Sequence, residues 1–280
     1  MRICSYILPT GTRSYGVMDD DGILDAGPDL RREFPDFRSI LTGSALNHLR
    51  DAKIGVRLAV SDVTLTPPIT NPDKIICVGL NYMSHIKETG RDTPKFPPIF
   101  IRHASSLVGH GEALRMPSVS DQFDYEGELA IVIGKSAHNL GVNEAMSIVS
   151  GYACFNDGSV RDYQRHTSQF WAGKNFIASG SMGPCLTLCE EVTDYTQCVL
   201  KTILNDVIVQ EVSLSDLAFD VANSVSYISS VTELLPGDII ATGTPAGVGM
   251  FRTPQLWLKP GDKIAVEVSG VGRLENKVQS

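Results

Sequence analysis

The segment Asp124–Lys135, DYEGELAIVIGK, combines the two features that decide the fold and the site of this 280-residue chain. Its second half, Leu129–Ile133, is apolar and rich in β-branched side chains, which predicts a buried strand. Its first half carries three carboxylates at alternate positions, Asp124, Glu126 and Glu128. On one strand, alternate side chains point to the same face, so these like charges would repel one another. The pattern therefore indicates a cation bound opposite them.

Composition excludes several classes of protein. The formal net charge of −8 argues against a nucleic acid or an anionic membrane as partner. No apolar run reaches the roughly 18 residues that a membrane span needs. The opening MRICSYILPTG lacks the pattern of a signal peptide, and the six cysteines form no C-x-x-C pair. We therefore expect a cytoplasmic protein with free, buried thiols.

The sequence pattern of the chain changes near residue 70. Residues 1–70 predict a small N-terminal α/β domain, with helical spacing over residues 30–52, and the proline-rich stretch TLTPPITNPDK marks the boundary. Over 71–280, short β-rich runs alternate with Gly/Pro turns, and the best helical patterns are 142–151 and 217–231. This pattern is typical of a predominantly β member of the α+β class.

Carboxylates in this arrangement suit a hard divalent cation, Mg²⁺ or Mn²⁺. A further candidate ligand is Asp157 in CFNDGS, where a predicted strand ends in a turn-rich segment. An aspartate there completes a metal site or simply caps a turn. The pair Glu126 and Glu128 has an ordinary alternative too, a solvated acidic strand. The residues alone leave both alternatives open.

Two further segments carry candidate catalytic side chains. His85 and Glu88 in GLNYMSHIKE are three residues apart, so on a helix they share a face and can hydrogen-bond. Such a carboxylate-oriented imidazole is a general base for water, although an incidental surface pair fits equally. Lys174 in FWAGKNF either stabilises an anionic group of a substrate or is an exposed lysine beside a turn.

The segment GDIIATGTPAGVG, residues 237–249, is a strand that runs into a Gly-rich turn with Thr242 and Thr244. Backbone N–H groups in such turns bind carboxylates or phosphates. The segment lacks the lysine of a P-loop, and no helix plainly follows it, so it is not a dinucleotide fingerprint.

In their order, GLNY…H…E, DYEGELAIVIGK, FNDGSVRDYQ, GKNF, LLPGDIIATGTPAGVG and LKPGDKIAVEVSGVGRLENKV resemble the fumarylacetoacetate hydrolase family over roughly residues 72–278. The resemblance implies a β-roll with a mixed β-sandwich, preceded by a small variable domain. It also implies a homodimer, and Mg²⁺ or Mn²⁺ as cofactor, with Ca²⁺ as a substitute in crystals.

The resemblance also assigns roles to residues of this chain. It implies that Asp124 is not a ligand but lies behind the ligands or at the surface. The implied metal ligands are Glu126, Glu128 and Asp157; the implied catalytic groups are His85, Glu88 and Lys174; and the implied substrate-binding residues are Tyr82, Arg161, Gln164 and Thr244.

The implied reaction is metal-dependent hydrolysis of a C–C bond in a 2,4-dioxo acid, such as an acylpyruvate, through a metal-bound enolate. Decarboxylation or isomerisation of 2-oxo or hydroxymuconate-type diacids uses the same enolate and stays open. A metal-binding protein without turnover is the alternative from another class, and it would not need the dyad or the lysine. The sequence departs from the family pattern at Ile177, where an acid is common, and at Arg102-His103, where acylpyruvase-like relatives often have Lys-Pro.

The polar segment Tyr82–Pro94, YMSHIKETGRDTP, contains Gly90 and ends in a proline. We expect it to act as a lid that is displaced without ligand and closes over the metal when a 2-oxo acid binds.

Overall fold

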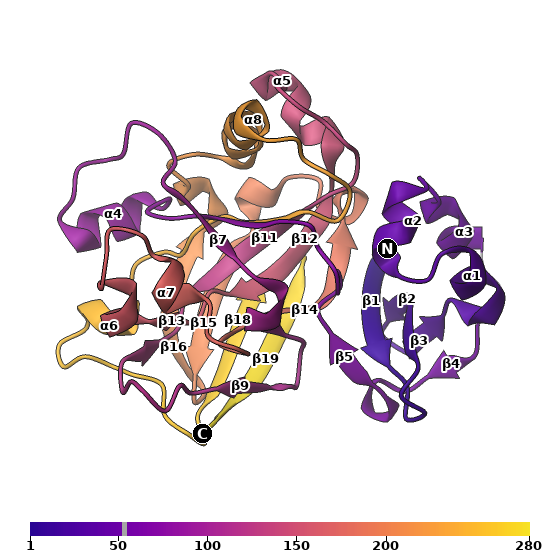
Figure 1. Ribbon diagram of the computed structural model, residues 1–280, viewed down its shortest axis with the longest axis horizontal. Coiled ribbons are helices and arrows are strands. Elements are labelled where there is room, and N and C mark those ends of the chain that lie inside the picture. The colour runs from indigo at the N-terminus through magenta and orange to yellow at the C-terminus, as the bar shows by residue number, and fades with distance from the viewer. Residues whose placement is uncertain (52–54) are drawn as a thin grey trace.

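The computed structural model describes residues 1–51 and 55–280, and in this part of the chain the strands form three sheets (Figure 1). The largest sheet contains β1 (Arg2–Ile7), β2 (Arg13–Asp19), β3 (Gly22–Asp25), β4 (Arg57–Leu58), β5 (Thr64–Thr66), β6 (Ile75–Val78), β7 (Ile99–Arg102), β8 (Leu107–Val108), β11 (Gly127–Ile133), β12 (Val149–Asn156), β14 (Gly180–Leu188) and β17 (Ile239–Ala241). A five-stranded sheet contains β9 (Ala113–Arg115), β15 (Val199–Leu204), β16 (Val207–Ser213), β18 (Lys263–Val268) and β19 (Gly272–Gln279). The third sheet pairs β10 (Phe123–Asp124) with β13 (Ser159–Val160).

The helices are short. They are α1 (Gly27–Glu33), α2 (Phe37–Thr42), α3 (Leu46–Asp51), α4 (Met83–Thr89), α5 (Val142–Ala145), α6 (Arg161–Gln164), α7 (Trp171–Lys174) and α8 (Val221–Val231). Each predicted helical segment contains helix, but with other bounds. Segment 30–52 is divided among α1, α2 and α3, segment 142–151 is α-helical only in α5 and reaches β12 at Val149, and segment 217–231 contains α8. The prediction of a predominantly β α+β fold is confirmed.

Strand β11 is buried on both faces and organises the core. Its alternate residues Leu129, Ile131 and Ile133 pack in a cluster with side chains of α8 and of the five-stranded sheet. Ala130 and Val132 belong to a second cluster, which includes side chains of β1 and α2. The large sheet is therefore a central layer between two cores, and the period-2 alternation of the strand accounts for both.

The N-terminal residues share a sheet with the rest of the chain. Strand β1 pairs antiparallel with β14, with Arg2 opposite Thr187 and Ile3 opposite Leu186. One core cluster contains Phe37 from α2 together with Ile75 and Phe155 from beyond residue 70. Figure 1 shows β1–β5 and α1–α3 grouped at one side of the molecule. The domain boundary near residue 70 stays a prediction, and the pairing joins the two proposed parts through a continuous sheet.

The prediction that Asp124, Glu126 and Glu128 lie on one strand was wrong. Strand β10 ends at Asp124 and β11 begins at Gly127, and the two strands belong to different sheets. The chain changes sheet between them, so the period-2 rule does not run through the whole segment. No helix in the described residues is long and apolar enough to cross a membrane.

Candidate functional site

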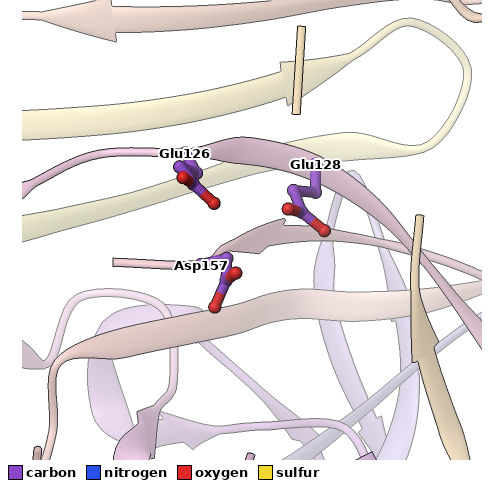
Figure 2. A group of neighbouring side chains, drawn as sticks. All are labelled: Glu126, Glu128 and Asp157. Carbon is purple, nitrogen blue, oxygen red and sulfur yellow. The ribbon is translucent and has the colours of Figure 1, made fainter. Parts of the chain in front are cut away.

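The pairing of β11 with β12 brings three carboxylates together. Gly127 is opposite Asn156, so the residues just before β11 and just after β12, Glu126 and Asp157, are neighbours. The Asp157 N–H donates to the Glu126 carbonyl at 2.8 Å, and this hydrogen bond fixes their separation. One carboxylate oxygen from each of Glu126, Glu128 and Asp157 lies within 4.8 Å of the others, and all three side chains are buried (Figure 2).

Three cationic side chains surround this cluster. Lys174 Nζ donates to Glu126 Oε2 and to Asp157 Oδ2, both at 2.6 Å. Arg161 Nη1 lies 2.6 Å from the other oxygen of Glu126. Arg102 Nη1 donates to Asp157 Oδ1. Among the described residues, Glu128 has no cationic partner within salt-bridge distance; its Oε2 accepts one hydrogen bond, from the Gly243 N–H at 2.9 Å.

The pKa shifts follow from these partners. Burial alone would raise the pKa of Glu126, but the charges of Lys174 and Arg161 outweigh it and hold the pKa well below its usual range. Burial and the charges of Asp157 and Glu126 raise the pKa of Glu128 well above its ordinary value. Burial lowers the pKa of Lys174, but the charges of Asp157 and Glu126 outweigh burial and raise it. With these two carboxylates beside it, the Lys174 ammonium is stabilised in its charged form.

The carboxylate cluster fits a divalent cation. Its donors are carboxylate oxygens, the ligands that Mg²⁺ and Mn²⁺ prefer. An unpaired buried carboxylate such as Glu128 is costly unless it is protonated or neutralised by a cation. The cluster groups the three residues that the resemblance implies as ligands, Glu126, Glu128 and Asp157, and their binding of a metal ion stays a prediction.

Asp124 is fully buried beside the cluster and is not one of the three grouped carboxylates. Arg161 Nε donates to its Oδ2 at 2.8 Å, so the guanidinium of Arg161 bridges Asp124 and Glu126. The N–H groups of Gly249 and Met250 also donate to Asp124, at 2.8 and 3.0 Å. The resemblance implied that Asp124 lies either behind the ligands or at the surface. Asp124 is buried, and Arg161 lies between it and Glu126, so the surface position is wrong.

The predicted dyad is formed. His85 Nδ1 and Glu88 Oε2 are 2.8 Å apart on α4, and the other oxygen of Glu88 accepts the Gly247 N–H at 2.8 Å. Both carboxylate oxygens are thus engaged, which fixes the imidazole against rotation. His85 is 8% exposed and lines the same cavity as Glu126 and Glu128, so its free Nε2 is the nitrogen available to a bound molecule.

Two local features hold this geometry. The side chain of Asn81 donates to the carbonyls of Phe219 and Thr242 and accepts the Phe219 N–H, so it ties the start of α4 to the loop after β17. Gly243 has φ +93°, and a Cβ there would lie 2.8 Å from the Val78 carbonyl. Only glycine fits this left-handed, crowded position, from which the N–H reaches Glu128.

Most of the predicted substrate-binding residues line the cavity, namely Arg161, Gln164 and Thr244. Gln164 Oε1 accepts from Arg161 Nη1 at 3.0 Å. The Thr244 hydroxyl donates to the Gly127 carbonyl and accepts from Gln210 Nε2, both at 2.9 Å. Their contacts with a substrate stay predictions.

Tyr82 lies elsewhere. Its side chain is fully buried in the core cluster that contains Ile76 and Leu129, and it is not among the residues that line the cavity. Tyr82 forms an isolated β-bridge with Leu217 at the start of α4. This position does not favour the substrate contact predicted for it; it anchors the helix that carries the dyad.

The predicted lid divides into two parts. Tyr82–Glu88 is anchored, because Ile86 is buried, the Ser84 N–H donates to Asp216, and Glu88 is held by Gly247. After the left-handed cap at Gly90 (φ 68°), the chain to Pro94 has no regular structure, and Arg91 lines the cavity. Motion of the segment stays a prediction, and only the part after Gly90 is free of such anchors.

Sequence reasoning missed Arg102 as a residue of the site. Its guanidinium is 2% exposed and also contacts Ser106, Gly158 and Ser179. The sequence signal that could have found it is a charged residue at the end of the β-rich run PPIFIR, where Arg102 is the last residue of β7. Arg102 is the buried residue of a strand that is otherwise exposed or half-buried, and a buried arginine needs a carboxylate partner, which Asp157 supplies.

In the part of the chain that the structure describes, the fold holds a buried carboxylate cluster that fits a metal ion, close to a hydrogen-bonded histidine–glutamate pair. The family model described as fumarylacetoacetate (FAA) hydrolase C-terminal matches residues 74–279, and the chain belongs to this family. The relatives that are named in the next paragraph are enzymes.

Relatives of different activities are similar to the chain. The mitochondrial oxaloacetate tautomerase Fahd2a of Rattus norvegicus is 38% identical over 219 residues, 78% of this chain and 70% of the relative. The fumarylacetoacetate hydrolase from Exiguobacterium antarcticum has a TM-score of 0.89 at 31% identity and covers 100% of both chains. The maleylpyruvate hydrolase from a Sphingobium species, solved with manganese(II) and pyruvate, has a TM-score of 0.80 at 26% identity over 100% of this chain and 99% of its own.

Proposed function

We propose that this chain is a divalent-metal-dependent enzyme of 2-oxo acids and that it hydrolyses a C–C bond in a 2,4-dioxo acid of the acylpyruvate type. The observation that carries the proposal is the hydrogen bond between Glu88 and His85, which lines the same cavity as Glu126 and Glu128. This arrangement supports the proposal of a base for water beside a candidate metal centre. A purely structural metal site would need neither the dyad nor the buried Lys174.

A bound Mg²⁺ or Mn²⁺ would supply positive charge that stabilises an enolate of the substrate. Glu126, Glu128 and Asp157 would hold the ion. The manganese and pyruvate reported for the Sphingobium relative support this choice of metal and of substrate class.

His85 acts as the general base. Its Nε2 accepts a proton from water while Glu88 holds Nδ1–H, and the hydroxide adds to the C4 carbonyl of the dioxo acid. The C3–C4 bond then breaks, its electron pair moves to C3 as an enolate, and C4 leaves as a carboxylic acid. Protonation at C3 by the imidazolium gives the 2-oxo acid product and restores His85. The Lys174 ammonium, with two of its three N–H donors on Glu126 and Asp157, adds a fixed positive charge beside the developing oxyanion.

Tautomerisation of a 2-oxo diacid is the second candidate, favoured by the 38% identity to the oxaloacetate tautomerase of Rattus norvegicus. It needs the same enolate but no attack by water. His85 would then carry a proton between C3 and the enol oxygen, and Lys174 would keep its electrostatic role. Decarboxylation of oxaloacetate likewise needs the enolate alone.

The two substrates acetylpyruvate and oxaloacetate test the proposal directly. We expect acetylpyruvate, with Mg²⁺ present, to lose the ultraviolet absorbance of its enol and to yield acetate and pyruvate in equal amounts, and we expect EDTA to stop the reaction. Equilibration of enol and keto oxaloacetate without cleavage of acetylpyruvate would favour the tautomerase. Absence of any change with either substrate, at several divalent metals, would contradict an enzymatic role.

A further inference from the structure

The Gly-rich segment 237–249, which the sequence predicts to bind anions, binds carboxylates of this chain itself. Its glycine N–H groups donate to three carboxylates at 2.8–2.9 Å: Gly243 to Glu128, Gly247 to Glu88 and Gly249 to Asp124. The first carboxylate belongs to the grouped cluster, the second to the histidine–glutamate pair, and the third lies behind the cluster. The segment therefore connects the candidate metal centre with the candidate base.

Gly247 is held on both sides of its own backbone. Its N–H donates to Glu88 Oε1, and its carbonyl accepts from the Tyr125 hydroxyl and from Arg252 Nε, both at 3.0 Å. Its φ is +102°, and a Cβ there would lie 2.3 Å from the Val209 carbonyl, so only glycine fits. Because a glycine backbone rotates more freely than any other, the two hydrogen bonds to the carbonyl fix the direction in which the N–H points.

The two side chains that hold this carbonyl are tied to each other and to the carboxylate cluster. Arg252 Nε also donates to the Tyr125 hydroxyl at 3.0 Å, and Arg252 Nη2 donates to the Val209 carbonyl. Tyr125 is fully buried and directly precedes Glu126, one of the three grouped carboxylates. The hydroxyl of Tyr125 therefore relates the position of the Gly247 carbonyl to that of the cluster.

Further contacts hold the loop 247–252 against the same two parts of the site. Asp124, the residue before Tyr125, accepts two backbone N–H groups of this loop, at 2.8 and 3.0 Å. At the other side, the ring of Phe251 meets the ring of His85 edge-on, with 5.9 Å between centroids. The loop thus contacts the imidazole and its carboxylate partner while residues 124 and 125 anchor it.

We propose that Tyr125 and Arg252 are positioning residues that act through the backbone of Gly247. They keep Glu88 in the orientation that holds the imidazole of His85. The inference rests on the proposed function in one respect, that His85 is the base that accepts a proton from water. Since Glu88 Oε2 lies on His85 Nδ1, a neutral imidazole carries its proton on Nδ1 and leaves Nε2 as an acceptor.

Release of the Gly247 carbonyl should disturb this arrangement without touching the substrate. Gly247 could then turn its N–H away, and Glu88 would lose the donor that fixes its Oε1. A less restrained imidazole also adopts the tautomer with its proton on Nε2, which cannot accept one from water. Among the described residues, neither Tyr125 nor Arg252 lines the cavity, so binding of substrate should change little.

The first measurement is the tautomer of His85 in the metal-free protein at mildly alkaline pH. Long-range proton–nitrogen correlation spectra distinguish Nδ1–H from Nε2–H, and the spectrum of His85→Gln identifies the ring. The variants are Tyr125→Phe, Arg252→Met and the double variant. Tyr15→Phe is the matched control, because Tyr15 is also buried and its hydroxyl donates to the Phe34 carbonyl at 2.8 Å, away from the cavity.

We expect the Nδ1–H form in the natural chain and in the control, and a mixture in the double variant. The kcat for acetylpyruvate with Mg²⁺ should fall about threefold to tenfold in each single variant and about tenfold to a hundredfold in the double variant, as expected for one and two hydrogen bonds. KM and the affinity for Mn²⁺ should stay within about twofold of the natural values. Arg252→Lys should recover part of the kcat, because its ammonium still donates to the carbonyl.

Four results would overturn the positioning role. They are an Nε2–H form in the natural chain, an unchanged tautomer and kcat in the double variant, an equal loss of kcat in Tyr15→Phe and Tyr125→Phe, and a weaker affinity for Mn²⁺ with an unchanged kcat, which would mean that the two residues support the cluster and not the base.

Failure of the proposed function has a different signature. If the natural chain does not cleave acetylpyruvate, the role of His85 as base fails. The spectra still decide the positioning role, because a mixture of tautomers in the double variant supports it and a spectrum equal to that of the natural chain overturns it.

Discussion

Nζ of Lys174 lies 2.6 Å from Oε2 of Glu126, with both side chains buried. The same ammonium lies 2.6 Å from Asp157, so one lysine joins two of the three grouped carboxylates. Because the pair is taken out of water, removal of either partner leaves a buried charge that the surroundings must accommodate.

Replacement of this lysine should affect both stability and catalysis. Lys174→Met removes the cation while keeping the length of the side chain, so we expect the metal-free protein to lose about 3 kcal/mol of unfolding free energy. We expect kcat/KM for acetylpyruvate to fall by about 10²- to 10³-fold, the usual loss for one oxyanion donor. Urea melts without metal and steady-state kinetics at fixed Mg²⁺ measure the two effects. Unchanged stability with activity within twofold of the natural chain would exclude the role given to Lys174.

Glu128 should behave differently from the other two carboxylates, because it has no cationic partner. Glu128→Gln replaces a buried carboxyl whose ionisation is costly, and the new amide can donate to the neighbouring carboxylates, so the metal-free Tm should be at least as high as that of the natural chain. The increase in Tm that Mn²⁺ gives the natural chain should be lost, since a ligand is missing.

Differential scanning calorimetry with and without Mn²⁺ measures both quantities. Glu233→Gln is the matched control, because Glu233 is exposed and does not belong to the carboxylate cluster, and its Tm should rise with Mn²⁺ as in the natural chain. A full metal-induced shift in Glu128→Gln would remove Glu128 from the ligand set.

Arg102 should be required to hold Asp157 in place. Arg102→Leu leaves Asp157 without this partner, and we expect a loss of about 3–5 kcal/mol of unfolding free energy, as for other broken buried pairs. Arg102→Lys, which keeps the positive charge, should retain part of the stability and of the Mn²⁺ affinity that Arg102→Leu loses. Chemical denaturation and metal titration measure the two. If leucine and lysine have equal effects at this position, the charge of Arg102 does not position Asp157.

Among residues 1–70, the contacts of Asp25 should depend on pH, and they lie outside the carboxylate cluster. Asp25 accepts hydrogen bonds from Tyr6, Ser14 and Arg31. Burial opposes ionisation of Asp25, but these donors outweigh it and lower its pKa below 3.8. A depressed folded-state pKa gives stability that is present above the unfolded-state pKa and is lost as the pH falls through the folded-state value.

Asp25→Ala should therefore destabilise the protein by about 2–3 kcal/mol at pH 7, and the difference should shrink as the pH falls below 3.8. Asp29→Ala is the control, because the ion pair of Asp29 with Arg32 is exposed and its loss should stay within about 0.5 kcal/mol. Urea denaturation across the pH range is the measurement. A difference between Asp25→Ala and the natural chain that does not change with pH would contradict this account.

Short-range patterns in the sequence predicted the fold class and one side-chain contact near the cluster. Alternation in Leu129–Ile133 predicted a buried strand, and the i, i+3 spacing predicted the contact between His85 and Glu88. Both depend on residues that are close in the chain. The grouping of Glu126 with Asp157 depended on the resemblance to a known family, because the register between β11 and β12 brings the two side chains together.

Features that depend on distant contacts escaped prediction. The change of sheet between Asp124 and Gly127 is set by two different partner strands, which the local pattern does not encode. Tyr82 is placed in the core by the packing of α4, and Arg102 meets Asp157 across 55 positions of the chain. The pairing of β1 with β14 likewise joins segments that composition had separated.

The role of His85 as the base that activates water is the central claim, and one comparison tests it most directly. The measurement is kcat/KM of His85→Ala for acetylpyruvate cleavage and for oxaloacetate decarboxylation at fixed Mg²⁺. Cleavage needs activated water, so we expect it to fall by about 10²- to 10⁴-fold, whereas decarboxylation should fall far less. A fall by the same factor in both reactions would contradict the account, because His85 would then carry a proton common to both reactions and would not be dedicated to water.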